Sequence, residues 1–167
     1  MDYLWSPWRY QYISTADRNT GCIFCQKAQE NRDEENLVVW RGKRNFVLLN
    51  LYPYTTGHLM VAPYEHVATL AGAAVATAGE MMRIVRSAEK HLRNIYRPEG
   101  LNVGMNIGKA AGAGIADHIH MHVLPRWTAD ANFMTTVGET RIIPEELRVT
   151  YQKLSRAFAE EGGEDEK

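Results

Sequence analysis

Near the C-terminal third of the chain, three histidines alternate with apolar residues. Successive side chains of a β-strand point to opposite faces, so this spacing would place all three imidazoles on one face. The apolar partners would then enter a core on the other face. The chain has only six histidines, and a strand with a purely structural role would not require half of them. We therefore predict a strand with one reactive face, which reads His118, Ile119, His120, Met121, His122, Val123 and Leu124.

Length and composition are those of an ordinary globular domain. The 167 residues, 45% of them hydrophobic and 23% charged, suffice for one core that is stable without disulfides. A net charge of −1 argues against an electrostatic nucleic-acid binder. No signal-peptide pattern is visible, and no apolar run approaches the roughly 20 residues of a membrane span. We expect a cytoplasmic protein with neither a membrane nor a nucleic-acid partner.

Hydrophobic periodicity predicts one α+β domain with a mostly antiparallel sheet. A long helix is expected over 71–96, and His91 on it is expected to face solvent. A C-terminal helix is expected over 143–159, with Glu145 and Glu146 in its first turn. A short helix is expected at 22–30. Strands are expected at 37–40, 46–50, 58–63, 101–107 and 118–124.

A C-x-x-C pair, Cys22 and Cys25, suggests a metal site in the N-terminal part of the chain. Structural zinc takes four nitrogen or sulfur ligands in a tetrahedron, and the two thiolates would supply half of them. We expect the other two ligands to be His66 and His118. Two alternatives remain open, namely a thiol–disulfide pair and two cysteines that are buried by chance.

The middle histidine of the strand, His120, has an imidazole neighbour on either side of the same face. A neutral imidazole can attack phosphorus through one ring nitrogen while a hydrogen bond at the other fixes its tautomer. The preceding loop, 108–116, is mostly glycine and alanine. Its backbone N–H groups could approach phosphate oxygens closely at Gly112 and Gly114. The loop lacks the lysine and Ser/Thr order of a P-loop.

Three segments together resemble the histidine-triad (HIT) superfamily of nucleotide hydrolases and transferases. Residues 118–124 are similar to its signature H-φ-H-φ-H-φ-φ, in which φ is apolar. The stretch from Asn50 to His66 resembles the N-x-x-P…G-H…P-x-x-H strand of the family. The Cys22–Cys25 segment resembles the zinc-bearing members. The resemblance runs from about Cys22 to Trp127.

This resemblance implies a fold and an organisation of the chain. It implies an antiparallel sheet of about five strands with helices, one of them long, and a dimer formed through that helix and a strand edge. A tetramer is the alternative. The expected organisation is an aromatic N-terminal arm over 1–21, the HIT domain over 22–135, and a C-terminal helix with an acidic tail over 136–167.

The resemblance also implies a role for individual residues. A covalent nucleotidyl-histidine would form on His120, with His118 as a zinc ligand and His122 as a contact to phosphate or the leaving group. His58 would lie near the nucleophile and belong to the catalytic set. Trp127 could stack on an adenine or simply pack at the strand exit. The predicted substrate contacts are Asn50, Asn106, Gly112, Gly114, His122 and Trp127.

One departure from the family pattern bears on the substrate. Many members have Gln-Ser or Gln-Thr where this chain has Gly114-Ile115, and the missing hydroxyl argues against simple aminoacyl or phosphoramidate hydrolysis. The flanking segments and the Leu4-Trp5-Ser6-Pro7-Trp8-Arg9 pattern look like a bacterial subgroup that includes diadenosine tetraphosphate phosphorylases. The predicted substrate is a dinucleoside polyphosphate or related purine nucleotide, with phosphate or water as acceptor.

Three functional hypotheses follow from these observations. The first is cleavage of a dinucleoside polyphosphate, or of another adenylate conjugate, through His120. The second is a non-catalytic module that binds purine nucleotides on the same fold. The third makes the three triad histidines and two cysteines one metal site, although neighbours about 6–7 Å apart along a strand suit a single tetrahedral ion poorly.

Overall fold

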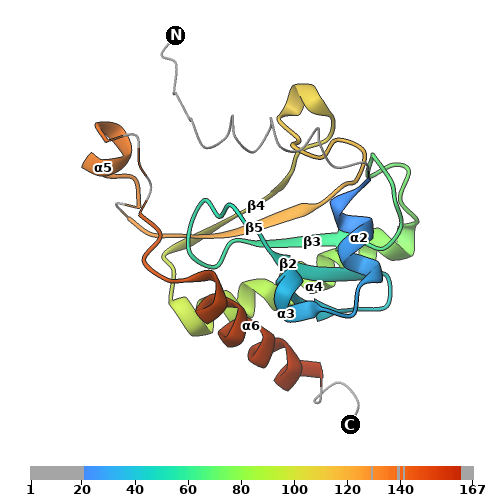
Figure 1. The fold of residues 1–167 in the computed structure, drawn as a ribbon, viewed down its shortest axis with the longest axis horizontal. Helices are drawn as coiled ribbons and strands as arrows, with labels where there is room; N and C mark the ends of the chain where they lie inside the picture. The colour runs from blue at the N-terminus through green and yellow to red at the C-terminus, as the bar shows by residue number, and fades with distance from the viewer. Residues whose placement is uncertain (1–20, 129, 139, 141, 163–167) are drawn as a thin grey trace.

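The computed structural model describes residues 21–128, 130–138, 140 and 142–162. Within them, five strands form one antiparallel sheet in the order β1-β2-β3-β5-β4 (Figure 1). The predicted α+β class and five-stranded antiparallel sheet are confirmed. Of the predicted N-terminal arm, all but Gly21 lies outside the described residues. The strands are β1 (Val38–Arg41), β2 (Asn45–Leu49), β3 (Leu59–Pro63), β4 (Gly100–Met105) and β5 (Met121–Arg126).

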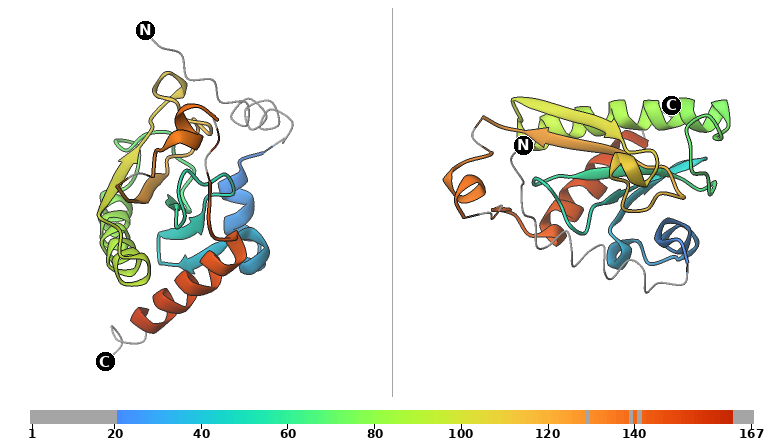
Figure 2. Two further views of the ribbon diagram at one scale, coloured as in Figure 1. Left: turned by 90° about the vertical axis from the view of Figure 1, so that its left-hand side faces the viewer. Right: turned by 90° about the horizontal axis from the view of Figure 1, so that it is seen from above.

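Helices cover both faces of the sheet. The long helix α4 lies along one face, whereas α2 and α3 lie on the other, as the view from above shows (Figure 2). Helix α6 packs against β1 and α4. No helix in the described ranges is long and apolar enough to cross a membrane. The helices are α2 (Ile23–Gln29), α3 (Asp33–Asn36), α4 (Val75–Tyr96), the 3-10 turn η1 (Lys109–Ala111), α5 (Phe133–Thr136) and α6 (Leu147–Gly162).

The main hydrophobic core lies between the sheet and α4. Strands β3 and β5 send alternate side chains into it, among them Leu59 and Val123, because strand side chains alternate between faces. Helix α6 adds Leu154 and Phe158 to the same core. A second, smaller cluster lies on the face covered by α2 and consists of Phe24, Val38, Phe46, Leu48, Met60 and Ala62.

The register between β3 and β5 determines which side chains meet on the α2 face. Met60 lies directly opposite His122, and Leu59 lies opposite Val123. His58 precedes β3 by one residue and shares the face of Met60, so it is the diagonal neighbour of His122. The same two segments of backbone thus carry these histidines on the α2 face and apolar side chains of the main core on the other face.

Strand pairing begins later in the triad segment than predicted. The ladder of β5 starts at Met121, so His118 and His120 lie in the segment that precedes it. Pairing between β3 and β5 ends at Val61 and Met121. Before it, the Ile119 N–H donates to the carbonyl of Val67, in the segment after β3, at 2.8 Å. The predicted alternation still holds, because Ile119 enters the main core while the imidazoles stay on the other face.

Two helices also begin later than predicted. Helix α4 starts at Val75 rather than at residue 71, because the Gly72 N–H bonds to the Thr69 carbonyl in a turn. Helix α6 starts at Leu147, so Glu145 lies before its first turn. The Glu145 carboxylate accepts hydrogen bonds from the hydroxyls of Tyr96, at 2.6 Å, and Thr150, at 2.8 Å.

Candidate functional site

Four side chains from three separate segments form a cluster that could hold a metal ion. Cys22 and Cys25 come from the start of α2, His66 follows β3, and His118 precedes β5. The His118 Nδ1 lies 3.2 Å from the Cys22 sulfur and 3.6 Å from the Cys25 sulfur. The His66 Nδ1 lies 3.3 Å from the Cys25 sulfur. Tetrahedral zinc, with bonds of about 2.0–2.3 Å, places its ligand atoms about 3.3–3.8 Å apart.

The surroundings of this cluster suit metal ligation. The His118 Nε2–H donates to the Pro63 carbonyl at 2.9 Å, which leaves Nδ1 unprotonated and facing the two sulfurs. Burial and the neighbouring Cys22 raise the pKa of the Cys25 thiol, and a bound cation would oppose that shift because it binds the thiolate. Two imidazoles that converge on both sulfurs are what a metal site requires and a redox pair does not.

His120 presents one ring nitrogen with a free lone pair. Its Nδ1–H donates to the His118 carbonyl at 3.0 Å, and since a carbonyl can only accept, Nε2 must be the unprotonated nitrogen. The side chain is buried, and burial lowers the pKa of His120 although the His118 carbonyl opposes this. The imidazole is therefore held in the neutral tautomer that a nucleophile needs.

His58 and His122 form a second chain of hydrogen bonds beside His120. The Tyr54 N–H donates to the His58 Nδ1 at 3.2 Å, so His58 carries its proton on Nε2. That Nε2–H donates to the His122 Nδ1 at 2.9 Å, which leaves His122 with a proton on its own Nε2. His122 is thus a hydrogen-bond donor next to His120, whose ring centroid is 4.9 Å away.

Both of these imidazoles are neutral near physiological pH. Burial, followed by the charges of His122 and His120, lowers the pKa of His58 to about 3. Burial and the charge of His120 lower the pKa of His122 to about 4. The pattern of donors and acceptors across the cluster is accordingly set by three backbone groups: the Pro63 carbonyl, the His118 carbonyl and the Tyr54 N–H.

The glycine-rich loop precedes the triad segment, as the sequence requires. Gly108 and Gly112 adopt φ angles of 84° and 87°, which only glycine tolerates without strain. The Asn106 amide lies within reach of the Gly112 carbonyl, at 3.4 Å, and Gly114 is exposed. Asn50 directly follows β2, where its side chain accepts the Tyr52 N–H at 2.9 Å and its N–H bonds to the His58 carbonyl.

Trp127 lies away from the imidazoles. It follows the last residue of β5, and about 23 Å of extended backbone separates it from His120, at roughly 3.3 Å per residue. The neighbouring Arg126 is held by Asp130 and Asn102. The structure does not bring Trp127 to the histidine cluster within one chain, and its contact with substrate stays a prediction.

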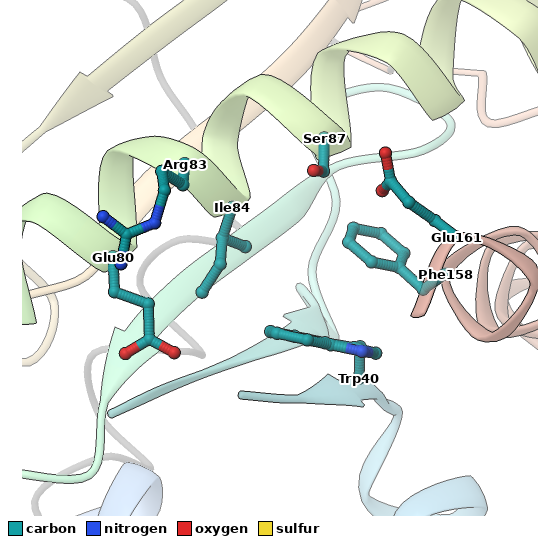
Figure 3. Close-up of a pocket in the computed structure, with 7 residues that line it drawn as sticks. All are labelled: Trp40, Glu80, Arg83, Ile84, Ser87, Phe158 and Glu161. Carbon is teal, nitrogen blue, oxygen red and sulfur yellow. The ribbon is translucent and has the colours of Figure 1, made fainter. Parts of the chain in front are cut away.

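A cavity of about 230 Å³ opens on the other face of the sheet (Figure 3). Trp40 and Phe158 form its aromatic walls, and Glu80 lies at one side. The Glu80 carboxylate already accepts the Lys43 N–H at 2.8 Å and the Asn45 amide at 3.2 Å. None of the imidazoles of the histidine cluster lines this cavity, so the candidate site is the cluster on the α2 face.

One prediction near that cavity is wrong. His91 was expected to face solvent, but it is buried with 6% of its surface exposed. Its Nε2 lies 2.8 Å from the Glu161 carboxylate, and its ring packs on Phe158. Helix α6 covers this position of α4, which the helical period alone could not reveal.

Sequence reasoning missed two residues that contact the site. The Phe24 ring packs on both His118 and His120, and the Tyr54 ring packs on His58. The position of Phe24 between the two cysteines was a usable signal. Tyr54 acts through its backbone N–H, which every residue but proline carries, so no side-chain pattern could have identified it.

Comparison with known proteins agrees with this geometry. The HIT domain family matches residues 31–129. An AP-4-A phosphorylase of Mycobacterium tuberculosis is 42% identical over 163 residues, which is 93% of this chain and 84% of that protein. An adenosine 5'-monophosphoramidase of Schizosaccharomyces pombe is 25% identical over 80% of this chain and 96% of that protein.

Solved structures share the fold. A zinc-bound histidine triad family protein from Mycobacterium smegmatis superposes with a TM-score of 0.66. It is 24% identical and covers 86% of this chain and 96% of its own. The family match spans more than half of the chain and contains the whole histidine strand. The chain therefore belongs to the HIT domain family.

Proposed function

We propose that this protein cleaves dinucleoside polyphosphates through a nucleotidyl intermediate on His120 and passes the nucleotidyl group to inorganic phosphate. The class is that of the nucleotide hydrolases and transferases of the HIT family, to which the phosphorylase and phosphoramidase relatives belong. The observation that carries the proposal is the unprotonated Nε2 of a buried, neutral His120 beside the donor His122.

In the first step, the His120 Nε2 lone pair forms a bond to the α-phosphorus of the substrate. The bond from that phosphorus to the bridging oxygen breaks, and its electron pair leaves with the departing nucleotide. His122 donates a hydrogen bond from Nε2 to this oxygen as negative charge develops on it. The His120 ring becomes cationic, and its Nδ1–H bond to the His118 carbonyl disperses that charge.

In the second step, an acceptor oxygen attacks the same phosphorus and the P–N bond breaks, which returns the electron pair to Nε2. With phosphate as the acceptor, a diadenosine tetraphosphate yields ATP in the first step and ADP in the second. With water as the acceptor, the second product is AMP. The 42% identity to an AP-4-A phosphorylase supports phosphate.

The substrate contacts that we propose lie on the loops around the cluster. Asn50 and the Gly112–Gly114 turn are proposed to hold the ribose and phosphates, and Asn106 and His122 to contact the α-phosphate. Their position supports these contacts. The Asn50 N–H donates to the His58 carbonyl, and the Asn106 amide lies beside the Gly112 carbonyl in the glycine-rich turn. We place the enzyme in the cytoplasm, where thiols stay reduced.

We further propose that Cys22, Cys25, His66 and His118 bind a structural zinc ion. The S₂N₂ donor set and its spacing support zinc, as does the zinc-bound relative from M. smegmatis. When bound, the ion would tie α2 to the segments that follow β3 and precede β5. It would take no direct part in the transfer steps, because these four side chains would fill the positions of a tetrahedral ion.

A homodimer is proposed through the β4 edge. Among the described residues no strand pairs with the outer side of β4; Val103 in β4 is 46% exposed, and Ile107, two residues after the strand, is 42% exposed. An apolar edge strand of this kind is a template for pairing with a second copy. Sedimentation velocity tests this: a monomer would contradict the proposal, and a tetramer would require a second contact surface.

The decisive experiment is incubation of purified protein with diadenosine tetraphosphate, with and without phosphate. We expect continuous turnover only when phosphate is present, with ADP and ATP in equal amounts; without phosphate, ATP release should stop at about one per site. Formation of ATP and AMP without phosphate would show a hydrolase, and turnover of a phosphoramidate alone would show a different adenylate conjugate as the substrate.

Mass spectrometry of the protein, quenched without acid, tests the intermediate. We expect an adenylylated wild-type protein and no such species in His120→Ala. His91→Ala is the matched control, because it removes a buried imidazole outside the cluster. Tight nucleotide binding without adenylylation would instead indicate a non-catalytic binding module.

A further inference from the structure

Phe24 lies between the two cysteines and directly against the nucleophile. Its side chain is 2% exposed. Its ring centroid is 4.8 Å from that of His120, with 37° between the planes, and 5.2 Å from that of His118. One aromatic side chain therefore contacts both a proposed metal ligand and the proposed nucleophile.

The His120 ring is held on three sides. The bond from Nδ1–H to the His118 carbonyl fixes one edge of the ring. The ring of His122 packs against it nearly edge-on, at 73°. Phe24 packs over it from α2, and this third contact is the only one of the three that comes from outside the triad segment.

Helix α2 is itself fixed by contacts at both of its ends. At its start, Cys22 and Cys25 meet His66 and His118. At its end, Arg41 of β1 donates to the carbonyls of Lys27, Ala28 and Glu30, at 2.8–3.0 Å. Phe24 belongs to the end of α2 that lies at the Cys/His cluster.

We propose that Phe24 is a positioning residue, which clamps the His120 imidazole and transmits occupancy of the metal site to the nucleophile. The clamp itself stands on the geometry alone, whereas its effect on turnover rests on the proposed function. The Cys-x-x-Cys segment would then act on the reaction as well as on stability, without touching the substrate.

The test compares two equivalent truncations of buried aromatic side chains in the same apolar cluster. Phe24→Leu removes the clamp, and Phe46→Leu is the matched control, since Phe46 is also fully buried but stacks on Tyr64. We expect kcat of Phe24→Leu to fall by about 100-fold, as expected when a reacting group is misplaced by about 1 Å. KM should stay within about threefold, because the substrate contacts remain.

A purely structural role predicts a different result. Phe24→Leu and Phe46→Leu would then lose the same activity at the same loss of thermal stability, and this would overturn the proposal. A rise in KM with kcat unchanged would also overturn it, because Phe24 would then be a substrate contact. Phe24→Tyr, which keeps the ring, should restore most of kcat.

A second readout does not depend on catalysis. In protein labelled with ¹³C at the histidine rings, the His120 signals are assigned from His120→Gln. We expect Phe24→Leu to shift and broaden them and Phe46→Leu to leave them unchanged. Unaltered His120 signals in Phe24→Leu would refute the clamp, whatever the activity of the protein. A wild-type protein without activity on any dinucleoside polyphosphate would refute only the proposed function.

The link to the metal is tested in the same spectra. His66→Ala removes the one exposed ligand of the cluster, and its zinc content is measured by elemental analysis. We expect zinc loss to broaden the His120 signals as Phe24→Leu does, with the fold retained by circular dichroism. If the variant keeps its zinc, a chelator removes it before the spectrum is taken. Sharp His120 signals in folded, zinc-free protein would refute the coupling.

Discussion

The two faces of the sheet are built by different physical means from the same strands. Among the described residues, the cluster on the α4 face buries fifteen apolar side chains and the cluster on the α2 face six. The α2 face also buries imidazoles, among them His58, His118 and His120. The α4 face is therefore stabilised mainly by removal of apolar surface from water, at roughly 25 cal/mol per Å². The α2 face depends on hydrogen bonds and on its proposed metal.

The residues that stabilise the core and those of the candidate site thus lie on opposite faces of one sheet. Alternation along β3 and β5 lets adjacent residues serve opposite purposes, as Ile119 and His120 do. A buried imidazole costs free energy unless its nitrogens are paired, and here His58, His118 and His120 each have one ring nitrogen paired with a backbone group. Substitutions on the two faces should accordingly have separable effects.

The strongest test substitutes the adjacent residues His120 and Ile119. His120→Ala should lower turnover by at least about a thousandfold, because it removes the proposed nucleophile. Ile119→Ala should instead lower the free energy of unfolding by about 2–5 kcal/mol, since it leaves a cavity in the main core. Urea denaturation and steady-state kinetics on both variants check this. Equal loss of activity per folded molecule in the two variants would contradict the separation.

Removal of the metal should affect the α2 face next most strongly. Cys22→Ser keeps the size of the side chain but weakens the site, so we expect loss of zinc and a fall of about 4 kcal/mol in the free energy of unfolding at saturating zinc. Thermal denaturation with and without added zinc measures this. A wild-type melting temperature that does not depend on zinc would contradict the proposed site.

The pH dependence of stability should arise from the α2 face. The pKa of His58 is about 3 in the folded state against 6.5 in the unfolded chain. Between these values the unfolded state binds the proton and the folded state does not. As pH falls below about 6.5, the free energy of unfolding should therefore decrease, by up to about 1.4 kcal/mol per pH unit for this group.

His58→Gln sharpens that measurement, because glutamine can still donate to His122 but does not titrate. Urea denaturation at pH 7, 6 and 5 should show a shallower decline for the variant than for the wild type. The contributions of the other titrating groups are shared by both proteins and cancel in the difference. Parallel curves would show that His58 is not held neutral by the fold.

The smallest effect is expected from the ion pair on the α4 side. Glu161→Gln weakens the contacts of Glu161 with His91 and Lys90, at 2.8 and 3.2 Å. We expect a loss of about 1 kcal/mol in the free energy of unfolding and no change in turnover. A change in kcat would mean that the two faces of the sheet are coupled and would contradict their separation.

Much of the fold could be predicted, because its signals are local. Alternation identified the triad segment and the face of each residue, and the helical period identified α4. Boundaries were less accurate: Gly72 forms a turn where the helix was expected to continue, and β5 pairs only from Met121. Those limits depend on which backbone groups find a partner, and that is decided by neighbouring segments.

The candidate site was predicted as a set of residues but not as a network. A short motif and two histidines predicted the candidate metal site, and the structure brings all four side chains together. The burial of His91 and the contact of Phe24 with His120 were not foreseen. The first depends on α6 packing on α4 and the second on α2 packing on the sheet, and such contacts between residues far apart in sequence leave no periodic trace.

By itself the sequence determined which side chains share a face, because the two-residue period of a strand and the 3.6-residue period of a helix are properties of the local backbone. Only the tertiary structure decided the protonation state of each imidazole. The Pro63 carbonyl, the Tyr54 N–H and the His118 carbonyl assign His118, His58 and His120 their tautomers, and the His58 Nε2–H in turn fixes that of His122. Almost every residue carries such backbone groups, so only their placement in space distinguishes those that act.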